Sequence, residues 1–154
     1  GRLIEIGDLD SIYRIMSVIA YEDIGLANPG MGPKVRAAIE SSELLGLPEA
    51  RIPLAVVVEE LALSPKSNSA ITAIDNALSD IRKGNTGNVP NHIKTNSKDY
   101  KYPHNYPKYY VEQQYLPDNI KNKRYYIPKI NTYENNLNKG NKEMRNIKWK
   151  QYQL

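Results

Sequence analysis

The sequence has 154 residues and a mass of 17.5 kDa, the length of one domain or of one domain with an arm, since domains run to roughly 100–200 residues. Hydrophobic residues make up 40% of it and charged residues 25%, so this length and composition exclude a multi-domain enzyme. Cysteine is absent, which excludes a disulfide scaffold, a thiolate metal site and a cysteine nucleophile. The longest apolar run, residues 52–58, is much shorter than the ~20 residues of a membrane-spanning helix. We therefore expect a soluble protein with no membrane partner.

Charge is distributed unevenly along the chain. Residues 1–84 carry 12 acidic and 8 basic side chains, whereas residues 85–154 carry 5 acidic and 13 basic ones, so the net charge of +4 conceals an acidic half and a basic half. The first methionine, Met16, lies well inside a patterned segment. We therefore expect the sequence to be a fragment of a longer protein.

The acidic half shows helical spacing in four segments. The first spans residues 9–21, where Asp8 or Asp10 is placed to cap the helix; its apolar stripe consists of Ile12, Ile15, Met16, Ile19 and Ala20. The second follows the break at residues 25–32. It has Pro33 in its first turn, and Gly46 can end it in a left-handed conformation.

The third segment runs from Pro48 to Pro65. A run of valines there is compatible with a strand, but Glu59, Glu60 and the flanking alanines favour a helix. In the fourth segment Ser67 caps the helix and Gly84 ends it; the apolar residues between them are Ile71, Ile74, Leu78 and Ile81. Four helices with short connections predict an all-α fold, an antiparallel bundle or an array of helical hairpins.

The amino-acid composition changes after Gly84. Asn, Lys, Tyr and Pro dominate, ten of the twelve tyrosines lie beyond residue 85, and no helical or strand period is sustained, so residues 85–133 are expected to be extended or irregular. We expect this segment to wrap over the helices and bury its rings. Residues 134–154 predict a weakly ordered tail with at most a short helix. The predicted fold is thus a bundle of about four to six helices followed by a tyrosine-rich wrapping segment.

Motifs for catalysis and for cofactor binding are missing. A phosphate-binding loop is absent, and the glycine cluster at residues 30–32 follows no strand. His92 and His104 could ligate a metal together with Asp99, but the clustered ligands of a closed zinc site are lacking; His104 is expected to be a hydrogen-bonded turn residue. We predict no catalytic, cofactor-binding or metal-binding residue in this chain.

Paired carboxylates and serines do not change this prediction. Neighbouring carboxylates such as Glu59 and Glu60 point about 100° apart on a helix and cannot converge on one substrate atom. Glu22 and Asp23 are adjacent in the same way, and Asp23 is a candidate helix cap. The serines near residue 67 have no patterned histidine partner.

The basic half mixes cations with tyrosines, as proteins that bind single-stranded nucleic acid do. The candidate nucleic-acid contacts are Lys94, Lys98, Lys101, Lys108, Lys121, Lys123 and Arg124. Two alternatives remain open. Lys, Asn, Tyr and Ile are encoded by A- and T-rich codons, so the enrichment can reflect genomic bias, and the tyrosines can pack on the bundle or on a second subunit.

Several motifs resemble one family of ATPases. Residues 21–27 (YEDIGLA), 51–55 (RIPLA) and 64–70 (SPKSNSA), in this order, are similar to the C-terminal domain of the replication-associated recombination protein A family, bacterial AAA+ ATPases also called MgsA and related to Werner-helicase-interacting protein. The likeness continues through residues 100–106 (YKYPHNY), 113–117 (QQYLP) and 124–128 (RYYIP). It covers about residues 2–130.

The resemblance implies a helical domain, residues 1–133, through which the ATPase assembles as a homotetramer. It also implies a parent that acts on DNA at stalled or damaged forks, with replication-fork proteins as partners, in the cytoplasm and near the nucleoid. ATP and Mg would bind to the parent's ATPase module, which has no position here, so no catalytic residue is carried over. The family has a longer basic stretch between its P-x-H and Y-K-Y-P-H motifs; here only residues 93–99 intervene, through a deletion or through a loop missing from the sequence.

Two kinds of site residue follow. Because aromatic residues are enriched in interface cores, the expected interface residues are Gln113, Gln114, Tyr115, Tyr125 and Tyr126. The remaining motif residues are expected to be structural; they are Glu22, Asp23, Gly25, Pro65, Lys66, Ser67, Asn68, Tyr102, Pro103 and His104. The first hypothesis is a non-catalytic tetramerisation domain, and the alternative is a nucleic-acid-binding module.

Overall fold

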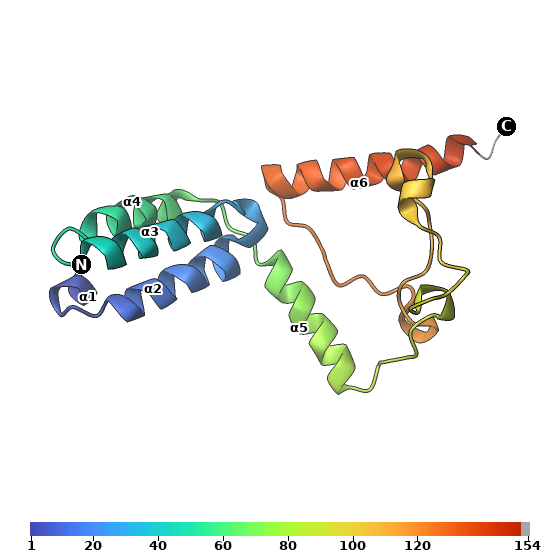
Figure 1. Ribbon diagram of the computed structural model, residues 1–154, viewed down its shortest axis with the longest axis horizontal. Coiled ribbons are helices and arrows are strands. Elements are labelled where there is room, and N and C mark those ends of the chain that lie inside the picture. The colour runs from blue at the N-terminus through green and yellow to red at the C-terminus, as the bar shows by residue number, and fades with distance from the viewer. Residues whose placement is uncertain (152–154) are drawn as a thin grey trace. The chain divides into compact units, whose positions relative to one another are not determined.

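The computed structural model describes the backbone of residues 1–151 and the side chains of residues 1–145. All regular structure in this range is helical, as predicted, and no strand occurs in it. The six α-helices are drawn in Figure 1; they are α1 (Arg2–Glu5), α2 (Leu9–Val18), α3 (Met31–Leu45), α4 (Arg51–Leu63), α5 (Ser69–Arg82) and α6 (Thr132–Gln151). None of the helices in the described range is long and apolar enough to cross a membrane.

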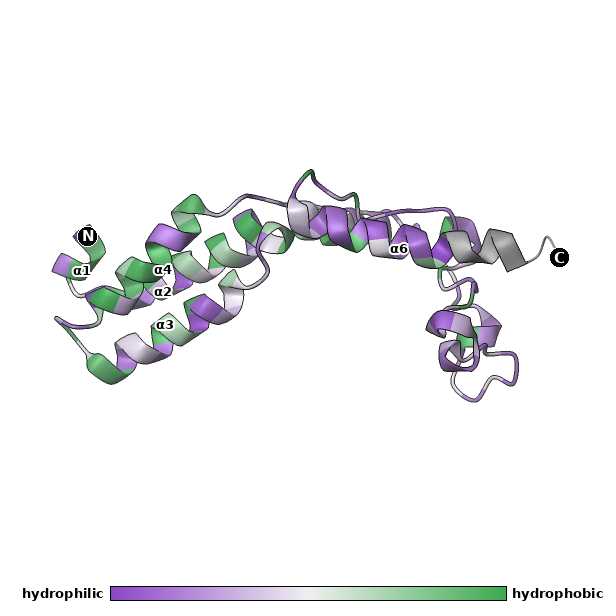
Figure 2. Ribbon diagram, turned by 90° about the horizontal axis from the view of Figure 1, so that it is seen from above, coloured by the Kyte–Doolittle hydropathy of each residue, from purple (hydrophilic) through white to green (hydrophobic). Residues whose placement is uncertain are grey.

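Internal contacts divide the chain into two units. The first unit consists of Gly1–Ile71 and Pro128–Asn136, and the second contains Thr72–Ile127 and the chain from Leu137 onward. In the first unit α3 packs against both α2 and α4, and α1 lies against α2 (Figure 1). These helices enclose one apolar core, made of Met16, Ala20, Ile24, Met31, Val35, Ala38, Ile39, Leu54, Val57 and Leu61. Figure 2 shows the hydrophobic turns of α2 and α4 that contribute to it.

Local signals account for the helix ends in the first unit. Asp8 caps α2, because its Oδ1 accepts a hydrogen bond of 3.1 Å from the Ser11 N–H. After Val18 the chain continues as a π-helix, Ile19–Ile24, so the predicted helix at 9–21 changes its winding near its end. Helix α3 begins at Met31, two residues before Pro33, and Gly46 follows its end with φ +67°. The valine run is helical, as predicted, and lies inside α4.

Helix α5 ends in a Schellman motif. Gly84 has φ +77°, its N–H donates to the Ile81 carbonyl at 3.0 Å, and the Asn85 N–H donates to the Asp80 carbonyl at 2.9 Å. This pattern satisfies two carbonyls that the end of a helix leaves without a partner. The end predicted for this helix at Gly84 is therefore confirmed.

The basic segment of the second unit is irregular, as predicted, but its wrapping over the helical core is not confirmed. Between residues 85 and 127 the only regular pieces are short 3₁₀ turns: Asn91–Ile93, Pro103–Asn105, Pro107–Tyr109 and Asp118–Ile120. Its connection to a helix is made with α5 of the same unit, where the Tyr125 hydroxyl donates to Asp80 Oδ2 at 3.0 Å. Helix α6 is longer, at 20 residues, than the short helix that the sequence predicts, and residues 152–154 of the predicted tail lie outside the described residues.

Candidate functional site

The family-like motifs at residues 21–27 and 64–70 contact each other in the first unit, and this contact is called the joint below. The Ser67 N–H donates to the Asp23 carbonyl at 2.8 Å. Gly25 has φ +46°, and a Cβ placed there would lie 2.7 Å from the Ser67 carbonyl oxygen. Glycine is therefore required twice at this position, for its backbone angle and for its lack of a side chain.

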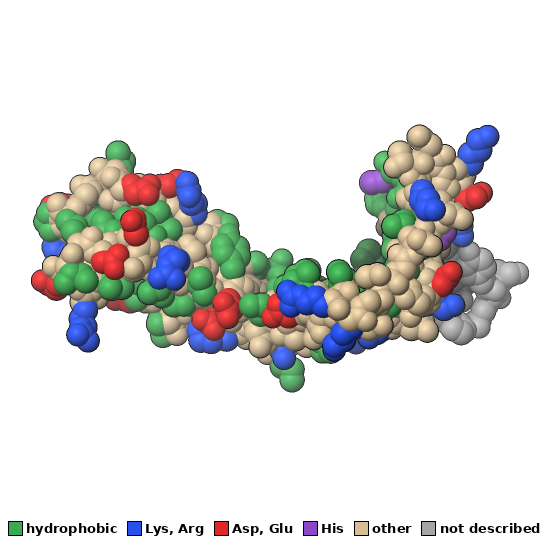
Figure 3. Space-filling model, turned by 90° about the horizontal axis from the view of Figure 1, so that it is seen from below, with side chains coloured by type: hydrophobic (Ala, Val, Ile, Leu, Met, Phe, Trp, Pro, Cys, Tyr) green, Lys and Arg blue, Asp and Glu red, His purple; other side chains and the backbone are tan. Residues whose placement is uncertain are grey.

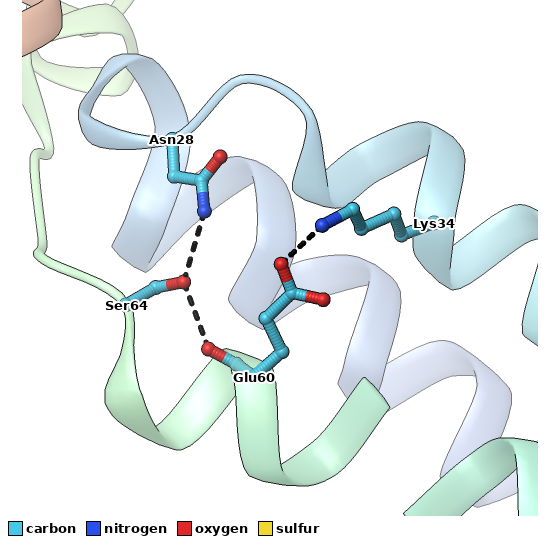
Figure 4. Close-up of polar contacts among 4 residues, drawn as sticks. All are labelled: Asn28, Lys34, Glu60 and Ser64. Atoms are coloured by element: carbon cyan, nitrogen blue, oxygen red, sulfur yellow. Dashed lines mark hydrogen bonds and ion pairs between the residues drawn. The ribbon is translucent and has the colours of Figure 1, made fainter. Parts of the chain in front are cut away.

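A polar network nearby joins the start of α3 to the end of α4 (Figure 4). The Asn28 amide donates to Ser64 Oγ at 3.2 Å, and the Ser64 hydroxyl donates to the Glu60 carbonyl at 2.8 Å. The Glu60 carboxylate forms an ion pair with Lys34 of α3. Together these contacts position the end of α4 against α3, while Pro65, Lys66 and Asn68 remain exposed.

A buried carboxylate completes the joint. Glu134 is fully buried and accepts hydrogen bonds from the Ser67 hydroxyl, from the Ser69 hydroxyl at 2.6 Å and from the Lys129 N–H. Burial alone raises the pKa of Glu134, but these hydrogen bonds outweigh it and the pKa is lowered. The carboxylate is therefore ionised, and it ties residues 128–136 to the N-terminal end of α5.

Sequence reasoning missed Glu134, although a local signal was present. Asn131 and Glu134 have the spacing of a capping box, and the Glu134 N–H donates to Asn131 Oδ1 at 2.9 Å. The partners Ser67 and Ser69 lie more than 60 residues away along the chain. The capping-box spacing could therefore have predicted the start of a helix, but not the hydrogen bonds of the carboxylate with Ser67 and Ser69.

An apolar groove opens on the first unit between α4 and the α1–α2 pair. It has a volume of about 1160 Å³, and its walls include Ile12, Ile15 and Ile19 on one side and Ile52, Ala55 and Val58 on the other. Figure 3 shows hydrophobic side chains reaching the surface of this bundle among charged ones. Exposed apolar surface of this extent, with a charged rim, is typical of an interaction site.

A second groove, of about 1170 Å³, lies in the second unit and has a different character. Tyrosines and cations line it; they are Tyr109, Tyr110, Tyr115, Lys121, Lys123, Arg124 and Arg145. Three of the seven predicted nucleic-acid residues, Lys121, Lys123 and Arg124, are thus brought together, and Arg145 of α6 joins them. The other four do not line this groove; they are Lys94, Lys98, Lys101 and Lys108.

One of these cations already has a partner. Lys123 Nζ lies 3.0 Å from Asp80 Oδ2, and Tyr125 and Asn85 also donate to the Asp80 carboxylate. The hydrogen bond from Lys123, followed by those from Asn85 and Tyr125, lowers the pKa of Asp80. Lys123 and Tyr125 therefore attach the basic segment to α5. Sequence reasoning did not single out Asp80, because Lys123 and Tyr125 follow it by more than 40 residues.

The predicted interface glutamines make hydrogen bonds within the second unit. Gln113 Nε2 donates to the Lys101 carbonyl at 2.8 Å and to the Tyr115 hydroxyl at 2.9 Å. Gln114 Nε2 donates to the Leu116 carbonyl at 2.9 Å and to Asp118 Oδ1 at 2.8 Å. Tyr126 is partly exposed.

Two residues of the Y-K-Y-P-H motif form an aromatic cluster with Tyr109, which lines the groove of the second unit. The ring of His104 lies 4.9 Å from that of Tyr102 and 5.5 Å from that of Tyr109, between centroids. Lys108 and Tyr109 both have left-handed backbone angles, φ 56° and 57°, which cost energy for residues other than glycine.

The histidines serve as local contacts. His92 Nε2 forms a hydrogen bond of 2.7 Å with the Gln114 carbonyl, and Pro103 and His104 belong to a 3₁₀ turn. Across the described residues, no three histidine, aspartate or glutamate side chains gather as metal ligands.

Comparison with known proteins identifies the family. The family model described as the C-terminal domain of the MgsA AAA+ ATPase matches residues 1–145. The chain is 62% identical over 139 residues to the replication-associated recombination protein A of Bacillus subtilis, covering 84% of this chain and 33% of that protein. It is 39% identical to an uncharacterized AAA domain-containing protein of Mycobacterium tuberculosis, over 76% of this chain and 28% of that protein.

A more distant relative shows the same extent of matching. Identity to the replication-associated recombination protein A of Escherichia coli K12 is 31%, over 79% of this chain and 30% of that protein. The chain thus spans about a third of the length of these curated relatives. It belongs to the MgsA AAA+ ATPase C-terminal family.

Proposed function

We propose that this chain is the homotetramerisation domain of an AAA+ ATPase. The observation that carries the proposal is the extent of apolar surface on the first unit, above all on α4, where Ile52, Val56 and Leu63 are 56%, 62% and 86% exposed. Each such side chain gains about 1.5–3 kcal/mol when it is fully buried. Surface of this kind favours association with further chains over a monomer.

A second apolar surface supports a tetramer over a dimer. On α5 the predicted stripe is exposed, with Ile74 at 54%, Leu78 at 37% and Ile81 at 56%. A tetramer with dihedral symmetry needs two different two-fold interfaces, and the two units each offer one candidate surface.

The role of the parent protein follows from the family. The relatives from Bacillus subtilis and Escherichia coli are named for recombination associated with replication. We propose that the parent acts in DNA replication, recombination and repair at stalled forks, in the cytoplasm and near the nucleoid, with fork proteins among its partners. ATP and Mg would bind to its ATPase module, and this domain would set the number and arrangement of those modules without a catalytic role of its own.

Native mass spectrometry of the 154-residue chain tests the proposal, because it counts subunits directly. We expect a dominant species of four chains in the absence of ATP and DNA. A spectrum that contains only single chains at micromolar concentration would contradict it.

A second function is favoured by the groove of the second unit. Tyr109, Tyr110 and Tyr115 line it together with Lys121, Arg124 and Arg145, which offers rings to stack on bases and cations to neutralise phosphates. Binding of single-stranded DNA in this groove is compatible with assembly through the other surfaces.

A further inference from the structure

Helix α4 is apolar on more sides than the first unit covers. Leu54, Val57 and Leu61 are buried in the core. Its outward face is apolar as well; the residues there are Ile52, Ala55, Val56, Val58, Ala62 and Leu63, and all of them are exposed. Because exposed apolar surface of this kind marks interaction sites, the outward face of α4 is a candidate surface for a partner.

Only two charged residues interrupt this outward face, and they are placed symmetrically. Arg51 lies four residues before Ala55, and Glu59 lies four residues after it. Both are exposed and line the rim of the apolar groove. When two copies of this face meet in antiparallel orientation, the basic residue of each copy lies opposite the acidic residue of the other.

We propose that the α4 helices of two copies of this chain pack antiparallel across a two-fold axis that passes near Ala55. In this register Arg51 of each copy faces Glu59 of the other, so two ion pairs form. Apolar residues meet in the same register, where Ile52 of each copy faces Val58 of the other; all four lie inside the α4 helices. The small side chain of Ala55 lets the two helices approach to the 8–10 Å between axes of ordinary helix packing.

The groove provides the space for this arrangement. The α4 helix of one copy lies along the opening between α4 and α2 of the other, where Ile15, 43% exposed, forms the opposite wall. The contact is isologous, because each copy offers the same surface and receives the same surface. The inference rests on the proposed assembly function and names one of its interfaces.

A charge exchange tests the register. Arg51→Glu and Glu59→Arg, each alone, place like charges against each other twice, and we expect each to raise the dissociation constant of this interface at least about tenfold. The double variant Arg51→Glu with Glu59→Arg restores both ion pairs and is expected to assemble as the original chain does. Both residues are exposed, so circular dichroism should show an unchanged helix content.

The control exchanges a charge pair elsewhere. Arg36 and Glu40 of α3 form an exposed ion pair 2.7 Å long within one helix, away from the groove. Arg36→Glu, Glu40→Arg and their combination are expected to leave assembly unchanged. Sedimentation velocity over a concentration series measures all of these variants.

Cross-linking locates the axis independently. The chain has no cysteine, so Ala55→Cys introduces a single thiol, and a disulfide between two copies needs their Cα atoms within about 7 Å. We expect a covalent dimer to form on mild oxidation of Ala55→Cys. Ala37→Cys, on the exposed face of α3, is the matched control and should remain uncross-linked.

The outcomes separate this inference from the function on which it rests. Loss of assembly in both single variants, restoration in the double variant and cross-linking at position 55 alone support the antiparallel pairing. If the original chain is assembled but the exchange has no effect, or the double variant is as weak as the single ones, the pairing is wrong and the assembly function stands. If the original chain is monomeric and Ala55→Cys does not cross-link, both are overturned.

Discussion

Gly25 connects two stretches of sequence that lie about 40 residues apart. Its φ of +46° and the close Ser67 carbonyl leave no space for a side chain. We predict that Gly25→Ala lowers the free energy of unfolding by about 1–3 kcal/mol, the usual cost of such strain. Urea denaturation at fixed protein concentration measures this.

Gly140 provides the control for that substitution. It lies within α6, and a Cβ there would meet nothing within 4 Å. Gly140→Ala should therefore stabilise the chain by about 0.5–1 kcal/mol, because alanine is the better helix former. Equal effects of the two substitutions would contradict the assigned role of Gly25.

Glu134 makes the stability of the first unit depend on pH. Its pKa is lower in the folded chain than in the unfolded chain, so its contribution is present above the unfolded pKa and is lost as the pH falls through the folded one. We predict that Glu134→Gln costs about 1–3 kcal/mol at neutral pH, the cost of disturbing buried hydrogen bonds. The difference from the original chain should shrink in acid.

Denaturation curves of the two proteins from neutral pH into acid check this. The same exchange at Glu143, an exposed residue of α6, serves as the control and should change little at either end of the range. The stability difference between Glu134→Gln and the original chain could instead stay constant over the whole pH range. That result would contradict the claim that the serine hydroxyls stabilise the ionised form of Glu134.

Helix α5 carries the apolar surface that the proposed tetramer needs in addition to α4. We predict that Ile74→Lys combined with Ile81→Lys leaves the helix content unchanged and reduces the assembly from four chains to two, because charged side chains oppose burial of this stripe. Light scattering measures the mass. Asn76→Lys, exposed on another side of the same helix, is the control, and a tetramer in the double variant would exclude the stripe from the interface.

The groove of the second unit predicts DNA binding that depends on salt. Lys121→Glu with Arg124→Glu should weaken binding to single-stranded DNA, and the log–log salt slope should fall by about 0.7 for every phosphate that is no longer neutralised. Lys123 is left in place because it pairs with Asp80. Fluorescence anisotropy with labelled oligonucleotides over a salt series measures both the affinity and the slope.

The control for the groove keeps the same charge change. Lys94→Glu with Lys98→Glu alters two exposed lysines of the same segment that do not line the groove. If the two pairs of substitutions weaken binding equally, DNA binds to a diffuse basic surface and not to the groove.

The helix ends could be predicted where the signals are local. Asp8, Gly46 and Gly84 act on residues within five positions of themselves, so their caps could be predicted from sequence alone. The contacts of Glu134 with the serines and of Asp80 with Tyr125 could not be identified, because these partners lie 40 or more residues away. The basic half could be predicted only as irregular, since tyrosine contacts have no period along the chain.

At the scale of the whole molecule, each of the two units exposes apolar side chains on a helix. The exposed faces of α4 and α5 lie in different units. The family could be recognised from motifs, whereas these surfaces could be found only from burial. Hydrophobic association of this kind depends little on salt, unlike binding driven by the basic half.

The most direct test is the mass of the purified 154-residue chain by light scattering, at low and at high salt. We predict a mass near four times 17.5 kDa in both conditions, without ATP or DNA. A mass of one chain in both conditions would contradict assembly through this domain, and the basic groove would then be the better account of its function.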